Sequence, residues 1–300
     1  MARRDFAQWV PEEPTSEVIE RVQQRSVAES LFRSWPMASR TRSIPRSAGI
    51  GVDAMQIGDT YNEDTSTADD VILTAQKFGR AVRIAEEDLN DTLPDTLASI
   101  KRDWATSYAV AIDNATIATS GALNVASGRP FTSIYETLRA SADNGYTAGA
   151  NIVTVASSAG PTYSELSQVV GLVEDSAWWD EARMVVAASP AYREALREIL
   201  DSNNRPIFVE GRDGTPDTLF GLPIRWTLGA RISNAVSASP TGSKLLVVLN
   251  PDYAALGKRS GPESMVSNEV GFLTDEPVIK MRARRGFAHT IPQAAAALVW

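Results

Sequence analysis

Few residue types in this chain could carry out chemistry. The sequence has no cysteine, which removes disulfides, thiolate nucleophiles and cysteine-bound metal sites. Its single histidine, His289, ends a predicted strand without a partner motif, so we expect a structural role for it. Gly49 and Gly51 lack the third glycine of a dinucleotide fingerprint, and neither a phosphate loop nor a zinc-protease motif occurs.

Carboxylates are the remaining candidates. Residues 86–91 hold an acidic cluster, but acidic residues also favour the start of a helix; its members are Glu86, Glu87, Asp88 and Asp91. The loop 210–217 could bind a cation, yet its glycine and proline content is typical of a plain loop. Two catalytic acids need not be close in sequence, so a soluble carboxylate-dependent hydrolase stays open as an alternative. We name no catalytic, cofactor-binding or metal-binding residue, and we expect no enzyme and no cofactor.

A long helical pattern from Thr92 to Ser120 is the element around which the chain is organised. Thr92 can cap it, with Pro94 and Asp95 in its first turn. Its apolar residues recur at steps of three and four, namely Leu97, Ile100, Trp104, Tyr108, Ile112 and Ala115. The polar residues should point largely elsewhere, namely Lys101, Arg102, Asp103, Asp113 and Asn114. About 26 residues would give a rod of roughly 39 Å, which is long for a chain of this size.

The segments before this helix differ sharply in charge. Residues 21–51 are basic, whereas residues 52–75 contain six acidic residues and no lysine or arginine. Large apolar residues around Phe32 and Trp35 predict an extended arm that needs another surface to bury it. Alternation over 71–84 predicts a projecting hairpin with its turn near residues 61–67.

The rest of the chain alternates between helices and strands. We expect a helix over 131–140, a second over 162–176 with a capping box, and a third from Ser189, with Leu196 and Leu200 on one side. Strands are predicted at 182–187, 207–210, 222–226, 245–249, 263–270, 277–287 and 294–300. The strand at 277–287 has one basic face, which suits either nucleic acid or an acidic neighbour; that face holds Lys280, Arg282 and Arg284.

Composition limits the function classes further. A net charge of −8 argues against a general nucleic-acid binder. No apolar run is long enough to span a bilayer, and the first residues do not resemble a signal peptide, so we expect a soluble protein made in the cytosol.

Taken together, the order of parts resembles the major capsid protein of tailed bacteriophages with the HK97-type fold. The resemblance covers nearly the whole chain, and its most specific piece is Phe220-Gly221-Leu222-Pro223-Ile224. It implies an α+β fold with an N-arm at 1–45, an E-loop at 46–80 and a peripheral domain with the spine helix at 81–120. The axial domain would follow at 121–262, then peripheral strands at 263–287 and an axial terminal strand at 288–300.

The resemblance implies a virion shell protein that assembles with itself as hexamers and pentamers around double-stranded DNA, bound without sequence specificity. It also implies synthesis in the host bacterial cytoplasm and a portal partner, with a decoration protein as a further candidate. The arm follows Met1 almost directly, so we expect a separate scaffolding protein or none. Some family members crosslink subunits through a hairpin lysine; here Lys77 lies at the base of the hairpin, so we expect no crosslink. An encapsulin-type shell around cargo enzymes is the alternative within this fold.

Overall fold

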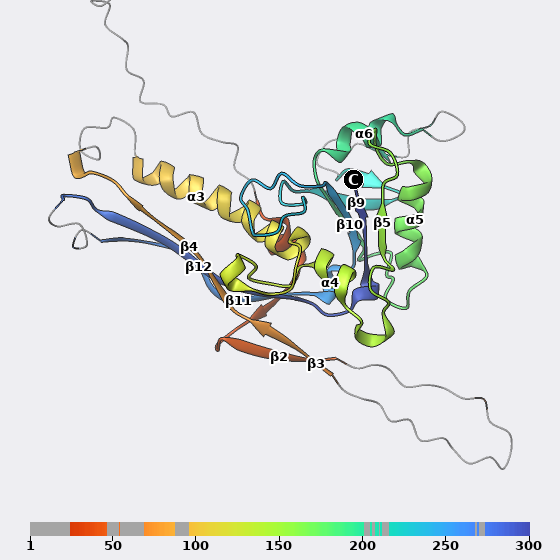
Figure 1. Ribbon diagram of the computed structural model, residues 1–300, viewed down its shortest axis with the longest axis horizontal. Coiled ribbons are helices and arrows are strands. Elements are labelled where there is room, and N and C mark those ends of the chain that lie inside the picture. Colours follow the sequence, from red (N-terminus) through yellow and green to blue (C-terminus); the bar gives the residue numbers. More distant parts are fainter. Residues whose placement is uncertain are drawn as a thin grey trace, which may run out of the picture.

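The computed structural model describes residues 25–46, 54, 69–87, 96–200, 205, 208–209, 211, 216–267, 269 and 274–300. In this part the α-helices of five residues or more are α1 (Val27–Leu31), α3 (Thr96–Asp113), α4 (Ile134–Ala140), α5 (Tyr163–Glu174) and α6 (Tyr192–Glu198). Figure 1 shows an elongated molecule in which α3 runs beside one long sheet and leads to a second sheet flanked by α4, α5 and α6. The predicted α+β class is confirmed.

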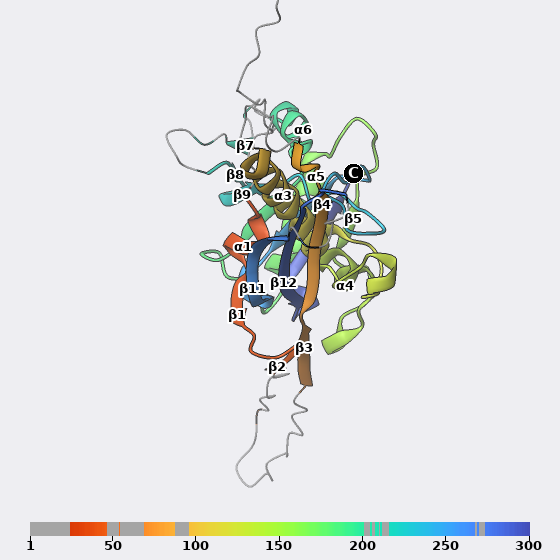
Figure 2. The same ribbon diagram turned by 90° about the vertical axis from the view of Figure 1, so that its left-hand side faces the viewer.

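The long sheet has four strands in the order β1-β11-β12-β4. Their bounds are β1 (Arg33–Pro36), β11 (Ala254–Ser267), β12 (Val278–His289) and β4 (Gln76–Arg83). β1 runs parallel to β11, and the other neighbours are antiparallel. The strand predicted from Glu263 in fact begins at Ala254, because apolar residues there pair with the end of β12. Turned by 90°, the sheet lies below α3 (Figure 2).

The second sheet has seven strands in the order β5-β13-β10-β6-β9-β8-β7. Their bounds are β5 (Ile152–Thr154), β13 (Ala295–Val299), β10 (Leu245–Leu249), β6 (Val185–Ala188), β9 (Leu222–Trp226), β8 (Thr218–Leu219) and β7 (Phe208–Val209). Every residue of β10 is buried, and alternate residues enter different cores: Val247 packs with α4, whereas Val248 packs with α5 and α6. Helices therefore cover both faces of this sheet.

The predicted elements of this region are confirmed with shifted ends. The capping box of α5 is complete, since Thr162 and Glu165 bond each other's backbone N–H groups. The helix predicted from Ser189 is short, and Leu200, expected on its buried side, is 47% exposed. The Phe220-Gly221 pair connects β8 to β9 with φ of 50° and 85°, the positive values that a two-residue type I′ hairpin turn requires.

The projecting hairpin differs from its prediction. β2 (Thr41–Arg46) pairs with β3 (Asp69–Thr74) as a separate two-stranded sheet. The alternation predicted through residue 84 is broken at Ala75, and β4 then joins the long sheet beside β12. The predicted turn at 61–67 lies outside the described residues.

The arm is also partly buried by its own chain, which the sequence did not predict. Phe32 is 4% exposed, and its ring centroid lies 5.5 Å from that of Phe287 in β12. Met37 is 5% exposed and packs with Leu73 and Ala255. The arm therefore contributes to the core of its own subunit over residues 27–37.

The end of α3 corrects another expectation. The helix continues into a π-helical turn, η2 (Asn114–Ala118), in which the Thr119 N–H bonds the Asn114 carbonyl. Asp113 and Asn114 were expected to point away from the core, yet they are 1% and 0% exposed. The predicted cap at Thr92 lies outside the described residues.

Asp113 joins three separate segments through four hydrogen bonds. It accepts from Ser26 Oγ at 2.6 Å and from the N–H groups of Val27 and Ala28, both at 3.0 Å. It also accepts from Thr227 Oγ1, after β9, at 2.6 Å. Burial raises the pKa of the Asp113 carboxyl, and these hydrogen bonds act against that shift. One carboxylate thus connects the start of α1, the end of α3 and the second sheet.

Asn114 makes the matching connection one residue later. Its amide donates to the carbonyls of Gly229 and Arg231 at 3.0 and 2.8 Å, and its side-chain oxygen accepts from Ser233 Oγ. The loop approaches so closely that a Cβ added at Gly229 would lie 2.7 Å from the backbone nitrogen of Asn114. The π-turn therefore fixes the loop that follows β9.

Replacing Asp113 by alanine should strongly destabilise the subunit. The change leaves four buried or part-buried donors without an acceptor, and we expect a loss of about 2–4 kcal/mol in the free energy of unfolding. Denaturant unfolding of dissociated subunits measures it. The exposed Glu181→Ala is the control, expected within about 0.5 kcal/mol of the unchanged protein. A loss for Asp113→Ala as small as the control's would contradict this role.

His289 is buried at the end of β12, and neither ring nitrogen meets hydrogen-bond geometry with a partner in the described part of the chain. Burial lowers its pKa to about 4, with the Tyr253 carbonyl acting weakly in the opposite direction. The His289 imidazole therefore stays neutral in the folded state at pH values where it is already protonated in the unfolded chain, whose histidine pKa is about 6.5.

The contribution of neutral His289 to the free energy of unfolding should accordingly be fully present above pH 6.5. It should decrease as the pH falls toward 4. Between pH 7 and pH 5 the loss attributable to His289 is about 2 kcal/mol. Because the chain has only one histidine, His289→Phe should remove this part of the pH dependence in denaturant unfolding. An identical pH profile for the variant and the unchanged protein would refute the assignment.

Candidate subunit interface

The β2–β3 hairpin forms a sheet of its own, and an ion pair links its two strands at the end that leads to residues 47–68. Arg46 in β2 pairs with Asp69 in β3, and Arg46 also donates to the Thr290 carbonyl at 2.6 Å. Ser43 donates to Asp70 at 2.7 Å. The hydrogen bond from Arg46 lowers the pKa of Asp69. One arginine of the basic arm thus balances the charge of Asp69, while Asp70 accepts from a neutral hydroxyl.

A cleft lies between the hairpin, β1 and the loops of the second sheet. Its cavity volume is about 800 Å³, and Trp35, Trp178 and Tyr253 contribute to its walls. The guanidinium carbons of Arg33 and Arg42 both lie over the Trp35 ring, 4.8 and 4.9 Å from its centroid. This packing holds the arm strand against the base of the hairpin.

The basic face predicted on β12 exists. Lys280 is exposed, while Arg282 and Arg284 are half-buried on the same face. Arg282 is not free, since its Nη2 lies 3.0 Å from Glu263 in the neighbouring strand. One charge of this face is therefore already balanced within the subunit.

Arg285, on the other face of β12, has a structural role. Its Nε lies 2.7 Å from Glu29 of α1, and Glu29 also accepts from the Tyr108 hydroxyl of α3 at 2.9 Å. Arg285 is 4% exposed. Burial raises the pKa of Tyr108, which keeps its hydroxyl protonated as the donor. This buried group joins α1, α3 and the long sheet.

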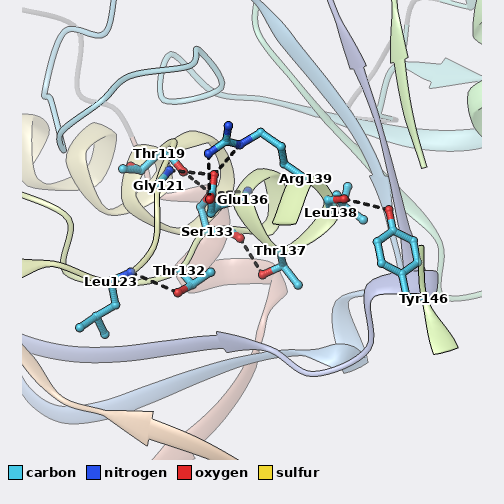
Figure 3. A network of polar contacts seen from close by, with 10 residues as sticks. All are labelled: Thr119, Gly121, Leu123, Thr132, Ser133, Glu136, Thr137, Leu138, Arg139 and Tyr146. Atoms are coloured by element: carbon cyan, nitrogen blue, oxygen red, sulfur yellow. Dashed lines mark hydrogen bonds and ion pairs between the residues drawn. The ribbon is translucent and has the colours of Figure 1, made fainter. Parts of the chain in front are cut away.

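A further buried acid, Glu136 in α4, organises the segment after α3 (Figure 3). It accepts from the Gly121 N–H at 2.8 Å and pairs with Arg139 at 2.8 Å. Ser133 caps α4 and also donates to the Thr119 carbonyl. A buried carboxylate with these partners is satisfied, so it has the features of a structural anchor rather than of a catalytic acid.

As far as the structure describes them, the acidic groups considered as chemical sites form no such site. In the loop 210–217, Asp217 accepts from the Gly211 N–H at 2.9 Å and from Arg193 at 3.1 Å. Burial tends to raise the pKa of Asp217, but these donors and Trp226 lower it overall. Of the cluster at 86–91, only Glu86 and Glu87 lie in the described residues. The described ranges contain no group of three metal-ligating side chains and no helix with the length and hydropathy to cross a membrane.

Sequence reasoning missed one group of basic residues that the fold brings together. A hollow of about 290 Å³ is lined by Arg40, Ala75, Gln76, Lys77, Arg259 and Arg284. They come from the turn before β2, the start of β4, β11 and β12. Only the position of Arg284 on a basic strand face pointed to it, because the other cations belong to segments far apart in the sequence.

Comparison with known proteins agrees with this architecture. The Phage capsid family matches residues 7–300. A solved structure from Mycobacterium phage Ogopogo has a TM-score of 0.73 at 16% identity, and each chain is 99% covered. The capsid of a native GTA particle gives a TM-score of 0.72 at 14% identity, covering 100% of this chain and 99% of the other. A structure from Microbacterium phage Oxtober96 gives 0.70 at 15%, covering 98% and 97%. No curated protein sequence matches.

The family match spans almost the whole sequence, and the solved structures share the HK97-type fold over nearly their full lengths. Neither the encapsulin nor the hydrolase alternative is favoured by these findings. The chain belongs to the phage capsid family, and it is a major capsid protein: a structural component of the virion shell that assembles with itself, not an enzyme.

Proposed function

We propose that this subunit forms hexamers and pentamers that close into an icosahedral shell around double-stranded phage DNA. The β2–β3 ladder carries the proposal: it pairs with no other strand in the described residues, and it leads from the body into an acidic section of the chain. A repeated subunit can use such a projection to bind the next copy, and the same contact then recurs around the shell.

The proposal also assigns each segment of the chain to a domain of the subunit. Residues 1–45 act as the N-arm and 46–80 as the E-loop, while 81–120 and 263–287 form the peripheral domain. Residues 121–262 and 288–300 form the axial domain, whose loops meet at the symmetry axes. The sheet memberships support a modified division, since β2 belongs with the hairpin and β4 and β11 extend the peripheral sheet.

The proposed partners beyond the chain itself are packaged DNA, bound without sequence specificity, and a portal. A separate scaffolding protein, if one is used, and a decoration protein complete the set. Synthesis takes place in the host bacterial cytoplasm. The absence of covalent crosslinks stays a prediction: denaturing gels of shells should show no multimers that depend on Lys77.

Electron microscopy and sedimentation of the purified protein test the proposal directly. We expect closed shells or capsomer rings, because self-association through many repeated contacts is cooperative. A protein that stays monomeric, even with a candidate scaffolding protein added, would contradict it. The contents of the shells distinguish the two shell functions. A phage capsid should contain nucleic acid, whereas an encapsulin-type shell should contain only cargo proteins.

The acidic hairpin section should contribute to contacts between copies. Neutralising Asp59, Glu63 and Asp64 together by amide substitution should weaken shells at low salt. Exposed ion pairs are worth only about 0–1 kcal/mol each, but they recur on every subunit. Shell dissociation as a function of salt measures the effect, which should shrink as salt screens the charges. Unchanged assembly of the variant at low salt would show that these three acids do not contribute to contacts between copies.

A further inference from the structure

Four cations meet at the hollow between the hairpin and the long sheet. Arg284 of β12 stands directly opposite Lys77 of β4 in the strand register. Arg259 of β11 and Arg40, before β2, line the same hollow. Like charges placed opposite each other on neighbouring strands destabilise a sheet, so this arrangement is unfavourable in the isolated subunit.

The charges of this cluster are not balanced within the described part of the subunit. None of the four has an ion-pair partner there, and no carboxylate lines the hollow. Neighbouring cations differ, since Arg46, Arg282 and Arg285 each pair with an acid of the same chain. What sets this cluster apart is that its four cations line one hollow, where a single group of anions could balance them together.

The size of the hollow limits what the anion can be. About 290 Å³ accommodates a few side-chain carboxylates, whereas a folded ligand or a nucleic-acid duplex needs a much larger or more extended surface. The chain itself supplies a matching partner, because residues 52–75 are acidic without any lysine or arginine.

The ladder geometry favours a second copy as the source of these acids. Arg40 and Ala75 stand at one end of the β2–β3 ladder, where the Ala75 N–H bonds the Arg40 carbonyl at 2.7 Å. Residues 47–68, which include Asp59, Glu63 and Asp64, join the ladder at its other end, beyond the Arg46–Asp69 pair. Five residue steps along a strand separate the two ends by about 17 Å. The chain toward Asp59, Glu63 and Asp64 thus leaves the ladder at the end opposite to Arg40, which favours a second copy as the partner of these acids.

We propose that the Arg40–Lys77–Arg259–Arg284 cluster is the receptor site for the carboxylates of the acidic hairpin section, centred on Asp59, Glu63 and Asp64, of a second copy of this chain. This proposal rests on the proposed shell function and names the site that the hairpin binds. Docking removes the like-charge repulsion between Lys77 and Arg284, so the strain of the isolated sheet favours association.

Charge reversal at the cluster tests the proposal. In Lys77→Glu combined with Arg259→Glu, the protein concentration needed to form shells at low salt should rise about tenfold. The same variant should be at least as stable as the unchanged subunit in thermal unfolding, because a carboxylate at position 77 faces Arg284. Assembly and subunit stability should therefore change in opposite directions, which a folding defect cannot produce.

Two further variants make the test specific. Lys280→Glu reverses one charge on the same sheet face outside the hollow and should alter the required concentration by less than about twofold. Adding Asp59→Lys, Glu63→Lys and Asp64→Lys to the cluster variant should restore assembly. All measurements use protein free of nucleic acid.

The outcomes separate this inference from the proposed function. Normal assembly of the cluster variant, an equal defect in Lys280→Glu, or failure of the charge exchange to restore shells would overturn the receptor site while leaving a shell-forming protein. An effect seen only when DNA is present would assign the cluster to phosphates and overturn it too. Failure of the unchanged protein to form shells would overturn the proposed function itself.

Discussion

The structure depends on one buried carboxylate at the point where the long helix ends. Asp113 accepts from the start of α1, from two backbone N–H groups and from the segment that follows β9. A desolvated carboxylate is stable only where donors compensate for the lost water, so its partners must stay in place. The arm, the helix and the second sheet are therefore joined through one group, and moving any of them would leave this buried carboxylate without some of its donors.

Two other buried groups extend this constraint. Glu29, Arg285 and Tyr108 join α1 to the long sheet and to α3, and Glu136 fixes the turn after the π-helical segment. The apolar core also crosses the junction, since residues of α3, β10 and β12 pack in the same cluster. A shell subunit must transmit contacts made at one end to the other without deforming, and these polar connections between packed elements provide that rigidity.

Buried charged groups differ from the charged groups at the hairpin in how they are balanced. Buried acids are each matched by donors or by an arginine, whereas four cations meet at the base of the hairpin without an acid from the described ranges. A subunit that functions alone gains nothing from such repulsion. A subunit that assembles with copies of itself can satisfy it with the acids of the next copy, which makes the isolated state less favourable and the assembled state more specific.

The sequence by itself determined the elements whose signals are local. The capping box at Thr162, the strands 222–226 and 245–249 and the basic face of β12 were all predicted, because periodicity and caps depend on neighbouring residues. Only the tertiary structure decided where charged residues find partners. Asp113 and Asn114 follow a helical pattern that places them away from its apolar stripe, but a π-turn and a loop 115 residues later along the chain bury them. Likewise, Lys77 and Arg259 come together only because β4 and β11 flank β12. Pairing between distant strands leaves no periodic pattern in the sequence, so their proximity could not be predicted from it.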